Sequence, residues 1–467
     1  MVSVAEPEDA APLTGEEHVP DFFGHPRGLW YLAFTEAWER FSFYGMQALL
    51  VLYMSKYLLQ PGHVEHVVAF DGVRKIYPNL DIQPLSSEIF GNYTAFVYLT
   101  PILGGFVADR FLGRRRAVLL GALTMAAGHF LMAFEAAFLF ALLCLVIGCG
   151  LFKGNIASQV GALYGPDDHR SNDAFQIFYL GINFGVIAAP LIVGTLGEKW
   201  GWHYGFAAAG VGMLLSTVIF LSGQRYLTDE DRSVRSGEPV IKEPRKKLTG
   251  TEWKAIIALI LLIPVLAVAI VPNNQIFNAY LIWGDQQFDL SFFGKKVPTT
   301  WLVTLDAIVS VSFLAIVAMF YRWYGKHWKE PDEIAKLIIG SVFSIGGMMC
   351  LFIAASTQAS GHKIGLFWPV AFHFINSIGF AHLLPISLAL FAKYAPKAVN
   401  ATIIGLYYLA FFAGNKLVGK IGALLTTLPT PKFWLLHAAL AAGSGLCFVI
   451  FKFVAGRSLR VTSAPSN

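Results

Sequence analysis

The sequence predicts an all-α integral membrane protein with twelve transmembrane helices in two six-helix bundles. The first observation is composition: 55% of the 467 residues are hydrophobic and only 14% are charged, against about a quarter in a typical globular domain. The second is length, because twelve spans of about 20 residues need about 240 mostly apolar positions, which this chain contains. The third is that long apolar stretches recur along the whole chain. Together these observations exclude an ordinary soluble protein.

Each half of the chain contains six apolar stretches that are long enough to cross a bilayer. In the first half they cover about residues 29–59, 88–112, 115–134, 137–164, 171–198 and 203–226. In the second half they cover about residues 252–284, 300–323, 333–357, 365–394, 399–427 and 432–456. The first and seventh stretches exceed the minimum length, which predicts tilt or extension beyond the hydrocarbon.

Basic residues predict the orientation of the chain in the membrane. Lys and Arg concentrate in alternate connections, among them DRFLGRRR and the segment from Arg225 to Lys247. On the other side, the loop at 60–87 contains only two basic residues, Arg74 and Lys75. Because cytoplasmic loops carry the excess of positive charge, we expect a multi-pass protein of the cell (inner) membrane with both termini in the cytoplasm.

A polar, charge-rich segment near the middle of the chain predicts two domains. A weak internal repeat supports the division, because RFLGR from Arg110, after the second span, resembles RWYGK from Arg322, after the eighth. Duplicated halves around a central site are common among transporters. The expected organisation is a cytoplasmic tail (1–28), a six-helix bundle (29–226), a cytoplasmic linker (227–251), a second six-helix bundle (252–456) and a second tail (457–467).

Other classes of function find little support in the sequence. The net charge of +5 comes from short basic clusters between apolar runs, which set membrane orientation and do not indicate a nucleic-acid partner. GNKLVGK lacks the Ser or Thr that ends a phosphate-binding loop, because Ile421 follows it. The spacing of His63, Glu65 and His66 matches no standard metal site. We therefore expect no cofactor, no metal and no enzymatic activity; an integral-membrane enzyme would need a nucleophile or metal constellation that the sequence does not show.

The first span contains ionisable residues on one helical face. In EAWERFSFYGMQ, Glu36, Glu39 and Arg40 recur at spacings of three and four, and Tyr44 and Gln47 extend the same stripe. A charge near mid-membrane costs about 2.5–3.5 kcal/mol, so this face is expected to line a central cavity. A carboxylate beside a guanidinium can act as a proton switch, since protonation releases Arg40 to bind an anion. The alternative is a buried ion pair that only fixes helix packing.

Three further polar residues fall inside predicted spans, and a fourth, Asp285, directly follows one. Lys153, in GLFKGNIASQ, needs a counter-ion, a water-filled cavity or loss of its proton, with a snorkelling lysine as the alternative. Asp306, in WLVTLDAIVSVSF, is a charge inside a span of the second half and needs a counter-ion or a water-filled cavity for the same reason. The alternative is an interhelical cap or a residue at the membrane boundary. Asn183 is less informative, because amides often just bridge membrane helices. Asp285, in IWGDQQ, is expected at an external mouth or on the cavity wall.

Several of these segments resemble the proton-dependent oligopeptide transporters of the major facilitator superfamily. In the first half the resemblance lies in EAWERFSFYGM, VYLTPILGGFVADRFLGRRR, FKGNIASQVGALY and FYLGINFG. In the second half it lies in GDQQ, Pro385 and YAPKAVNATIIGLYYLAFFAGNKLVG. It covers most of residues 29–456 and implies the major facilitator fold.

The resemblance also implies roles for individual residues. The first-helix charges would couple proton binding to release of the peptide carboxylate, with Lys153 as their electrostatic partner. Asp109 and Arg110 would belong to a cytoplasmic gate. The residues implied to contact the peptide backbone are Tyr44, Tyr98 and Asn183.

The sequence departs from the family pattern at several positions. Phe43 removes one hydroxyl of a tyrosine pair, and Gln47 replaces a second arginine of the first helix. Phe380 stands where the family has a glutamate near the peptide amino end. Asp306 stands where the family usually has an asparagine, so we expect the negative charge to have moved there. His382 is a rival candidate for proton handling, although a lone helix histidine is more often a packing residue.

The expected function is a proton-coupled symporter that imports di- and tripeptides by alternating access. The alternative keeps the fold and the proton coupling but carries another small substrate, such as nitrate, a modified amino acid or a peptide-like drug. The expected partners are small peptides, protons and the lipid bilayer, and the expected state is a monomer. The residues expected to couple protons are Glu36, Glu39, Arg40 and Lys153. Those expected to bind substrate are Arg40, Tyr44, Gln47, Tyr98, Lys153, Asn183, Asp285 and Asp306.

Overall fold

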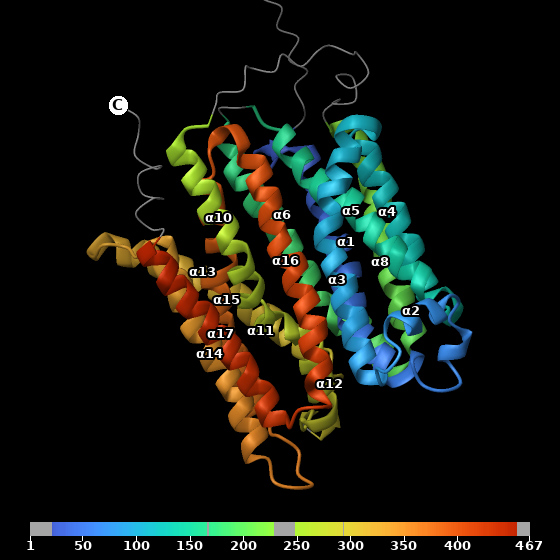
Figure 1. Ribbon diagram of the computed structural model, residues 1–467. Helices are drawn as coiled ribbons and strands as arrows, with labels where there is room; N and C mark the ends of the chain where they lie inside the picture. The colour runs from blue at the N-terminus through green and yellow to red at the C-terminus, as the bar shows by residue number, and fades with distance from the viewer. Residues whose placement is uncertain (1–20, 166–167, 228–247, 293, 455–467) are drawn as a thin grey trace, which may run out of the picture.

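The computed structural model describes residues 21–165, 168–227, 248–292 and 294–454, which are almost entirely helical (Figure 1). Much of the predicted linker and both predicted tails lie outside the described residues. In the first half, the long helices are α1 (Arg27–Tyr53), α3 (Ile82–Val107), α4 (Arg114–Leu131), α5 (Phe138–Ala162), α6 (Arg170–Ala189) and α8 (Trp202–Gly223). In the second half they are α10 (Gly250–Ala269), α13 (Trp301–His327), α14 (Glu333–Thr357), α15 (Phe367–Tyr394), α16 (Asn400–Gly422) and α17 (Thr430–Val454).

Shorter elements extend or connect these helices. Five-residue π-helical turns follow α1, α3 and α6, namely η1 (Met54–Leu58), η3 (Ala108–Leu112) and η5 (Pro190–Gly194). The short α-helices are α2 (Phe70–Ile76), α7 (Thr195–Lys199), α11 (Val271–Asn274) and α12 (Ala279–Gln287). The 3-10 turns are η2 (Val64–His66), η4 (Glu135–Ala137), η6 (Gln224–Tyr226), η7 (Gln275–Phe277), η8 (Lys397–Val399) and η9 (Ala423–Leu425). Two antiparallel hairpins pair β1 (Asp21–Phe22) with β2 (His25–Pro26) and β3 (Ser291–Phe292) with β4 (Lys295–Lys296).

Helical segments occupy all twelve predicted spans, so the predicted all-α membrane fold is confirmed. In the described part of the chain, ten helical segments are long and apolar enough to cross a membrane. The remaining two predicted spans, α1 and α4, are more polar: α1 contains Glu36, Glu39 and Arg40, and α4 begins with three arginines. The structure buries the three α1 charges inside protein, which is the condition for keeping them in a membrane.

Helix packing follows the two halves of the chain. In the first half, α1 packs on α6 and α8, and α5 packs on α3 and α4. In the second half, α14 packs on α15 and α17, and α10 packs on α16. Across the halves, α3 lies against α16 (Figure 1). The crossing is close, because a Cβ atom on Gly91 would lie only 2.5 Å from the Cα atom of Gly419.

Glycines also allow α6 to approach the charged segment of α1. A Cβ atom on Gly185 would lie 2.4 Å from the carbonyl oxygen of Ala37, and one on Gly181 would lie 2.9 Å from that of Ala33. Small residues four apart are the usual means by which membrane helices approach closely. The glycines of FYLGINFG therefore position α6 beside the ionisable stripe of α1.

The seventh predicted span is helical, but its helix is interrupted near the middle. α10 ends at Ala269, the short helix α11 and the turn η7 follow, and α12 begins after Asn278, whose φ and ψ are −128° and −109°. Pro272 lies in this break and lacks the amide hydrogen that a continuous helix uses. The fully buried side chains of Gln275 and Asn278 both donate to the carbonyl oxygen of Val418, at 3.1 and 3.2 Å. Irregular backbone at membrane depth is tolerated where protein buries it in this way.

Candidate functional site

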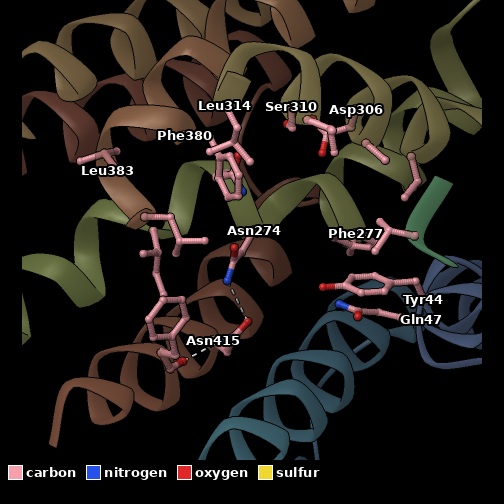
Figure 2. Close-up of a pocket in the computed structure, with 18 of the residues that line it drawn as sticks. Tyr44, Gln47, Asn274, Phe277, Asp306, Ser310, Leu314, Phe380, Leu383 and Asn415 are labelled. Carbon is pink, nitrogen blue, oxygen red and sulfur yellow. Dashed lines mark hydrogen bonds between the residues drawn. The ribbon is translucent and has the colours of Figure 1, made fainter. Parts of the chain in front are cut away.

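A cavity of about 300 Å³ lies between the two halves of the chain. Its walls come from α1, α3 and α6 on one side and from α10, α11 and α13–α16 on the other. Figure 2 shows Tyr44 and Gln47 on one side of the cavity, with Asp306, Ser310 and Phe380 on the opposite side. The polar lining residues are Tyr44, Gln47, Tyr98, Tyr179, Asn183, Asn273, Asn274, Asp306, Ser310, Ser344, Ser387 and Asn415.

Five of the predicted substrate-binding residues meet at this cavity. Tyr44 and Gln47 reach it from α1, Tyr98 from α3, Asn183 from α6 and Asp306 from α13. They lie far apart in the sequence and come from both halves of the chain. Among the described residues that line this cavity, Asp306 is the one with a carboxylate.

The predicted charge cluster of α1 is buried next to this wall. The Nε atom of Arg40 lies 2.7 Å from Oε1 of Glu36 and 2.7 Å from Oε2 of Glu39. The exposed fractions of the side chains are 9% for Arg40, 5% for Glu36 and 0% for Glu39. Tyr44, one helical turn after Arg40, lines the cavity. The cluster is thus held inside the protein, beside the cavity and away from lipid.

The two glutamates of this cluster differ in their hydrogen bonding. The Nε atom of Arg40 has one hydrogen, which it donates to Glu36. Within the described part of the chain, neither carboxylate oxygen of Glu39 accepts a hydrogen bond. A buried charged group without a hydrogen-bond donor is costly, and a proton on Glu39 would remove that charge.

Lys153 approaches the same wall from α5 through aromatic rings. Its Nζ atom lies 4.1 Å from the ring centroid of Phe43 and 5.6 Å from that of Tyr98. An ammonium over an aromatic face is attracted to the ring. Tyr98 itself lines the cavity, and its ring stacks on that of Phe411 of α16 with 5.0 Å between the ring centroids. Lys153 does not itself line the cavity, but the ring of Tyr98 links it to the cavity wall.

Asp285 was expected at an external mouth or on the cavity wall, and it does not line the cavity. Its carboxylate lies 2.8 Å from the Nζ atom of Lys56 and accepts a hydrogen bond from Thr299 at 2.9 Å. The physical reason is the break in the seventh span, because α12 leads the chain past the cavity before Asp285 is reached. Asp285 therefore joins the two halves at the end of the molecule where α2 and α12 lie (Figure 1).

The predicted gate residues lie at the opposite end. Asp109 and Arg110 are both exposed, in η3 after α3. An oxygen of Asp109 lies 3.5 Å from the Nε atom of Arg114, which belongs to the same half. A contact of this pair with the second half is not found among the described residues. The gate assignment stays a prediction.

Sequence reasoning missed a group of asparagines at the cavity. Asn274 donates to the Oδ1 atom of Asn415 at 3.2 Å, as Figure 2 shows, and both residues line the cavity. Asn376 donates to Asn273 at 2.8 Å, again beside the cavity. The signal for this group was the segment VPNNQ within an apolar run, since interrupted helices often mark transporter binding sites.

The remaining second-half candidates differ in their surroundings. Phe380 lines the cavity beside Leu314 and Leu383, so this part of the wall is apolar (Figure 2). His382 does not line the cavity. Both of its ring nitrogens are within hydrogen-bond distance of other groups. The partners are the carbonyl oxygen of Ile378 at 2.8 Å and the hydroxyl of Tyr321 at 3.0 Å.

Comparisons with known proteins agree with this geometry. The family model described as Major Facilitator Superfamily matches residues 41–419. The chain is 28% identical to the peptide transporter YePEPT of Yersinia enterocolitica, covering 86% of this chain and 88% of that protein. It is also 28% identical to a di-/tripeptide transporter of Lactococcus lactis, covering 92% and 96% of the two chains. A crystal structure of the peptide transporter POT with alafosfalin is similar at a TM-score of 0.80 and 27% identity, covering 96% of this chain and 98% of the other.

Proposed function

The chain belongs to the Major Facilitator Superfamily, and on that basis we propose that it is a proton-coupled symporter that imports di- and tripeptides by alternating access. The predicted resemblance to the peptide transporters of this superfamily is confirmed by relatives that carry that name. The membership makes the chain a multi-pass membrane transporter. The substrate-binding and proton-coupling roles of individual residues are part of the proposal.

The observation that carries the proposal is the distribution of charge around the cavity. On the first-half side, Arg40 and Lys153 lie behind the wall formed by Tyr44 and Tyr98. On the second-half side, Asp306 contributes a carboxylate. A short peptide is a zwitterion, with a carboxylate at one end and an ammonium at the other. The cavity can therefore bind such a molecule with each end near the opposite charge.

The polar groups between these charges suit a peptide backbone. Asn183, Asn274 and Asn415 offer amide donors and acceptors along the cavity wall. The volume of about 300 Å³ lies at the lower end of the usual range for small-molecule sites. Side-chain tolerance is expected, because only the backbone and the termini are common to all short peptides.

Proton coupling is proposed to operate through Arg40 and Glu39. While Glu39 is ionised, the positive charge of Arg40 is balanced by two carboxylates. When Glu39 takes up a proton, one carboxylate is neutralised and Arg40 gains attraction for the peptide carboxylate. Release of the proton on the other side restores the original balance and expels the peptide. The membrane potential contributes about 2.3 kcal/mol per net charge per 100 mV.

Alternating access requires contacts between the two halves that close one end of the cavity and break when that end opens. We name Lys56, Asp285, Glu198, Thr299 and Thr300 the inter-half clamp. In addition to the Lys56–Asp285 pair, the carboxylate of Glu198 in α7 accepts from the backbone amides of Thr299 and Thr300, both at 2.8 Å. These amides lie at the start of α13, where a helix favours negative charge. The first half thus supplies the cap of a second-half helix.

The clamp supports a proposal about the conformation of the protein. It lies at the end where α2 and α12 are found, opposite the start of α1 and the end of α17 (Figure 1). With both termini in the cytoplasm, as the basic loops predict, the clamp closes the external end of the cavity. The structure then represents an inward-facing state. The orientation, the inner-membrane location, the two-domain boundaries and the monomeric state are parts of this proposal.

Weakening the clamp is expected to favour opening of the external end. In Glu198→Gln, one of the two carboxylate acceptors becomes an amide nitrogen, and the interaction with the start of α13 loses its charge. We expect a loss of about 1 kcal/mol of closure free energy, equivalent to about a fivefold shift in the conformational equilibrium. Distances between spin labels on external loops of the two halves measure this shift.

The control for this variant is Glu65→Gln. Glu65 is exposed at the same end and accepts from the backbone amide of Gly62 within its own half. It should leave the label distances unchanged. Equal distance distributions for Glu198→Gln and the unmodified protein would contradict the clamp.

The proposed function is tested by uptake of labelled dialanine into liposomes that contain the purified protein. An inwardly directed proton gradient should drive accumulation above the external concentration, and dissipating the gradient should abolish it. Unlabelled di- and tripeptides should compete, whereas single amino acids and nitrate should not. Competition by nitrate or an amino acid, but not by peptides, would favour the alternative substrate class.

A further inference from the structure

Three side chains of the second half form a hydrogen-bonded row that begins at the cavity and ends in the protein core. Oδ1 of Asp306 lies 3.0 Å from Nδ1 of His373, and Nε2 of His373 lies 2.8 Å from the hydroxyl of Tyr280. The row links three separate elements, α13, α15 and α12. Tyr280 belongs to the segment that follows the break in the seventh span. Neither His373 nor Tyr280 stood out in the sequence as a functional residue.

Among the three residues of the row, Asp306 is the one that lines the cavity. The side chain of Asp306 is 14% exposed and lines the cavity, whereas the side chain of His373 is 0% exposed. Tyr280 is also fully buried. A proton that reaches His373 from the cavity must therefore pass Asp306. A neutral imidazole can occupy this place by donating from Nδ1 to Asp306 and accepting from Tyr280 at Nε2.

A charged imidazolium also finds a partner for each of its nitrogens in this place. Both of its nitrogens then donate, one to the carboxylate of Asp306 and the other to the oxygen of Tyr280, whose hydroxyl changes from donor to acceptor. The positive ring beside Asp306 leaves the pair with no net charge. Histidine is the side chain that most readily gains or loses a proton under physiological conditions.

Few titratable side chains of the described residues lie directly beside the row. Among the described residues, the titratable side chains that face His373 directly are Asp306 from α13 and Tyr280 from α12. From α17, His437 contacts Trp434 at 5.4 Å between ring centroids, and Trp434 contacts Tyr280 at 6.5 Å.

The other charged residues of the helices around α15 have partners or positions elsewhere. On α14, Glu333 pairs with Lys393 near the far end of α15, and Lys336 pairs with Glu330. On α16, Lys416 donates to Asn92 of α3. Also on α16, Lys420 lies near the clamp end, beyond Lys416. The charged residues of α10 are at its first turn, in GTEWK, at the opposite end from the break.

We propose that Asp306, His373 and Tyr280 form a second proton-binding site, in which a proton on His373 and the ammonium group of the substrate are alternative ways to balance the charge of Asp306. When a peptide ammonium pairs with Asp306, the imidazolium is disfavoured because two cations would share one carboxylate. His373 then returns its proton to the cavity through Asp306. When the substrate has no ammonium, the proton stays on His373 and travels with the substrate.

This inference rests on the proposed function and makes a prediction that the function alone does not. A peptide with a free amino group and the same peptide with a blocked amino group should be carried with different numbers of protons. The blocked peptide should bring about one additional proton, held at His373, because the proton replaces the missing ammonium. The charge that crosses the membrane with the substrate is then the same for both peptides.

The test measures the ratio of proton flux to substrate flux in proteoliposomes, for dialanine and for N-acetyl-dialanine. The unmodified protein should carry about one more proton with N-acetyl-dialanine at about pH 6, and the difference should shrink as the pH is raised, because a proton on an imidazole is lost at high pH. In His373→Gln the two ratios should be equal, since glutamine can donate to Asp306 but cannot take up a proton. His362→Gln, an exposed loop histidine of the same half, should retain the difference.

Each possible outcome bears on the proposal. Equal ratios in the unmodified protein, a difference that persists in His373→Gln, or failure to carry N-acetyl-dialanine at any pH would overturn it. If His373→Gln does not fold, Tyr280→Phe provides the test. That variant removes only the hydroxyl that accepts from the imidazolium. The difference in proton number between the two peptides should therefore disappear at a lower pH than in the unmodified protein. Absence of proton-driven dialanine uptake would instead contradict the proposed function, which keeps the two failures distinguishable.

Discussion

Replacing Glu39 by glutamine is expected to give a protein that exchanges peptide across the membrane but no longer accumulates it. Glutamine has nearly the same shape as a protonated glutamate, so the fully buried side chain keeps its packing. It fixes the cluster in the state in which one carboxylate balances Arg40. Because neither oxygen of Glu39 accepts a hydrogen bond within the described part of the chain, the substitution leaves no donor there without its acceptor.

The size of this effect follows from the free energy of the proton gradient. One pH unit supplies about 1.4 kcal/mol per proton, enough for about tenfold accumulation of a peptide that travels with one proton. In Glu39→Gln the ratio of internal to external dialanine should fall to about one. Counterflow, which needs no net proton movement, should persist. Both are measured in the same proteoliposomes.

The control for this experiment is Asp71→Asn. Asp71 is an exposed carboxylate of α2, far from the charge cluster, and its substitution should leave accumulation intact. Continued accumulation by Glu39→Gln in response to a pH difference would show that Glu39 does not hold the coupled proton. Loss of counterflow together with accumulation would indicate a folding or binding defect, which thermal unfolding of the purified variant would detect.

The second large effect is expected from Asp306→Asn. The substitution removes the carboxylate of the cavity wall and leaves the peptide ammonium without a counter-charge. Truncating one partner of a hydrogen-bonded charge pair costs about 2–5 kcal/mol, and the exposure of Asp306 to the cavity places the expected loss near the lower value. The apparent affinity for dialanine should therefore fall by about 30-fold. Concentration dependence of uptake at a fixed proton gradient measures it.

A matched carboxylate in the same half provides the comparison. Asp289 is exposed and accepts from the backbone amide of Ser291 at 3.2 Å. Asp289→Asn should leave the affinity for dialanine unchanged. Normal affinity and normal proton dependence in Asp306→Asn would remove Asp306 from the substrate site and with it the idea that the acid has moved from the tenth to the eighth span.

Much of the fold could be predicted from the sequence, because membrane helices consist of long apolar runs. The broken seventh span is the exception. Its apolar composition predicts a span, while the break depends on Pro272 together with hydrogen bonds from Gln275 and Asn278 to a carbonyl of α16. Those bonds exist only after α16 has packed alongside. A local pattern cannot predict a structure that a distant helix stabilises.

The candidate site divides in the same way. Glu36, Glu39 and Arg40 were predicted together because they are neighbours on one helical face, and a helix places such residues side by side wherever it is located. Asp285 and Lys56 are 229 residues apart, and their pairing depends on how the two halves meet. The sequence therefore left Asp285 between two locations, and the structure assigned it to the clamp.

The amino-acid sequence by itself determined the membrane class, the twelve spans, the ionisable stripe of α1 and the family. These properties depend on composition and on residues close together in the chain. Only the tertiary structure decided that Asp306 lies across a cavity from Tyr44 and that His373 joins Asp306 to Tyr280. The sequence around a histidine in an apolar helix does not show whether the histidine fills a core or holds a proton. Its role depends on the groups that other helices bring within hydrogen-bond distance.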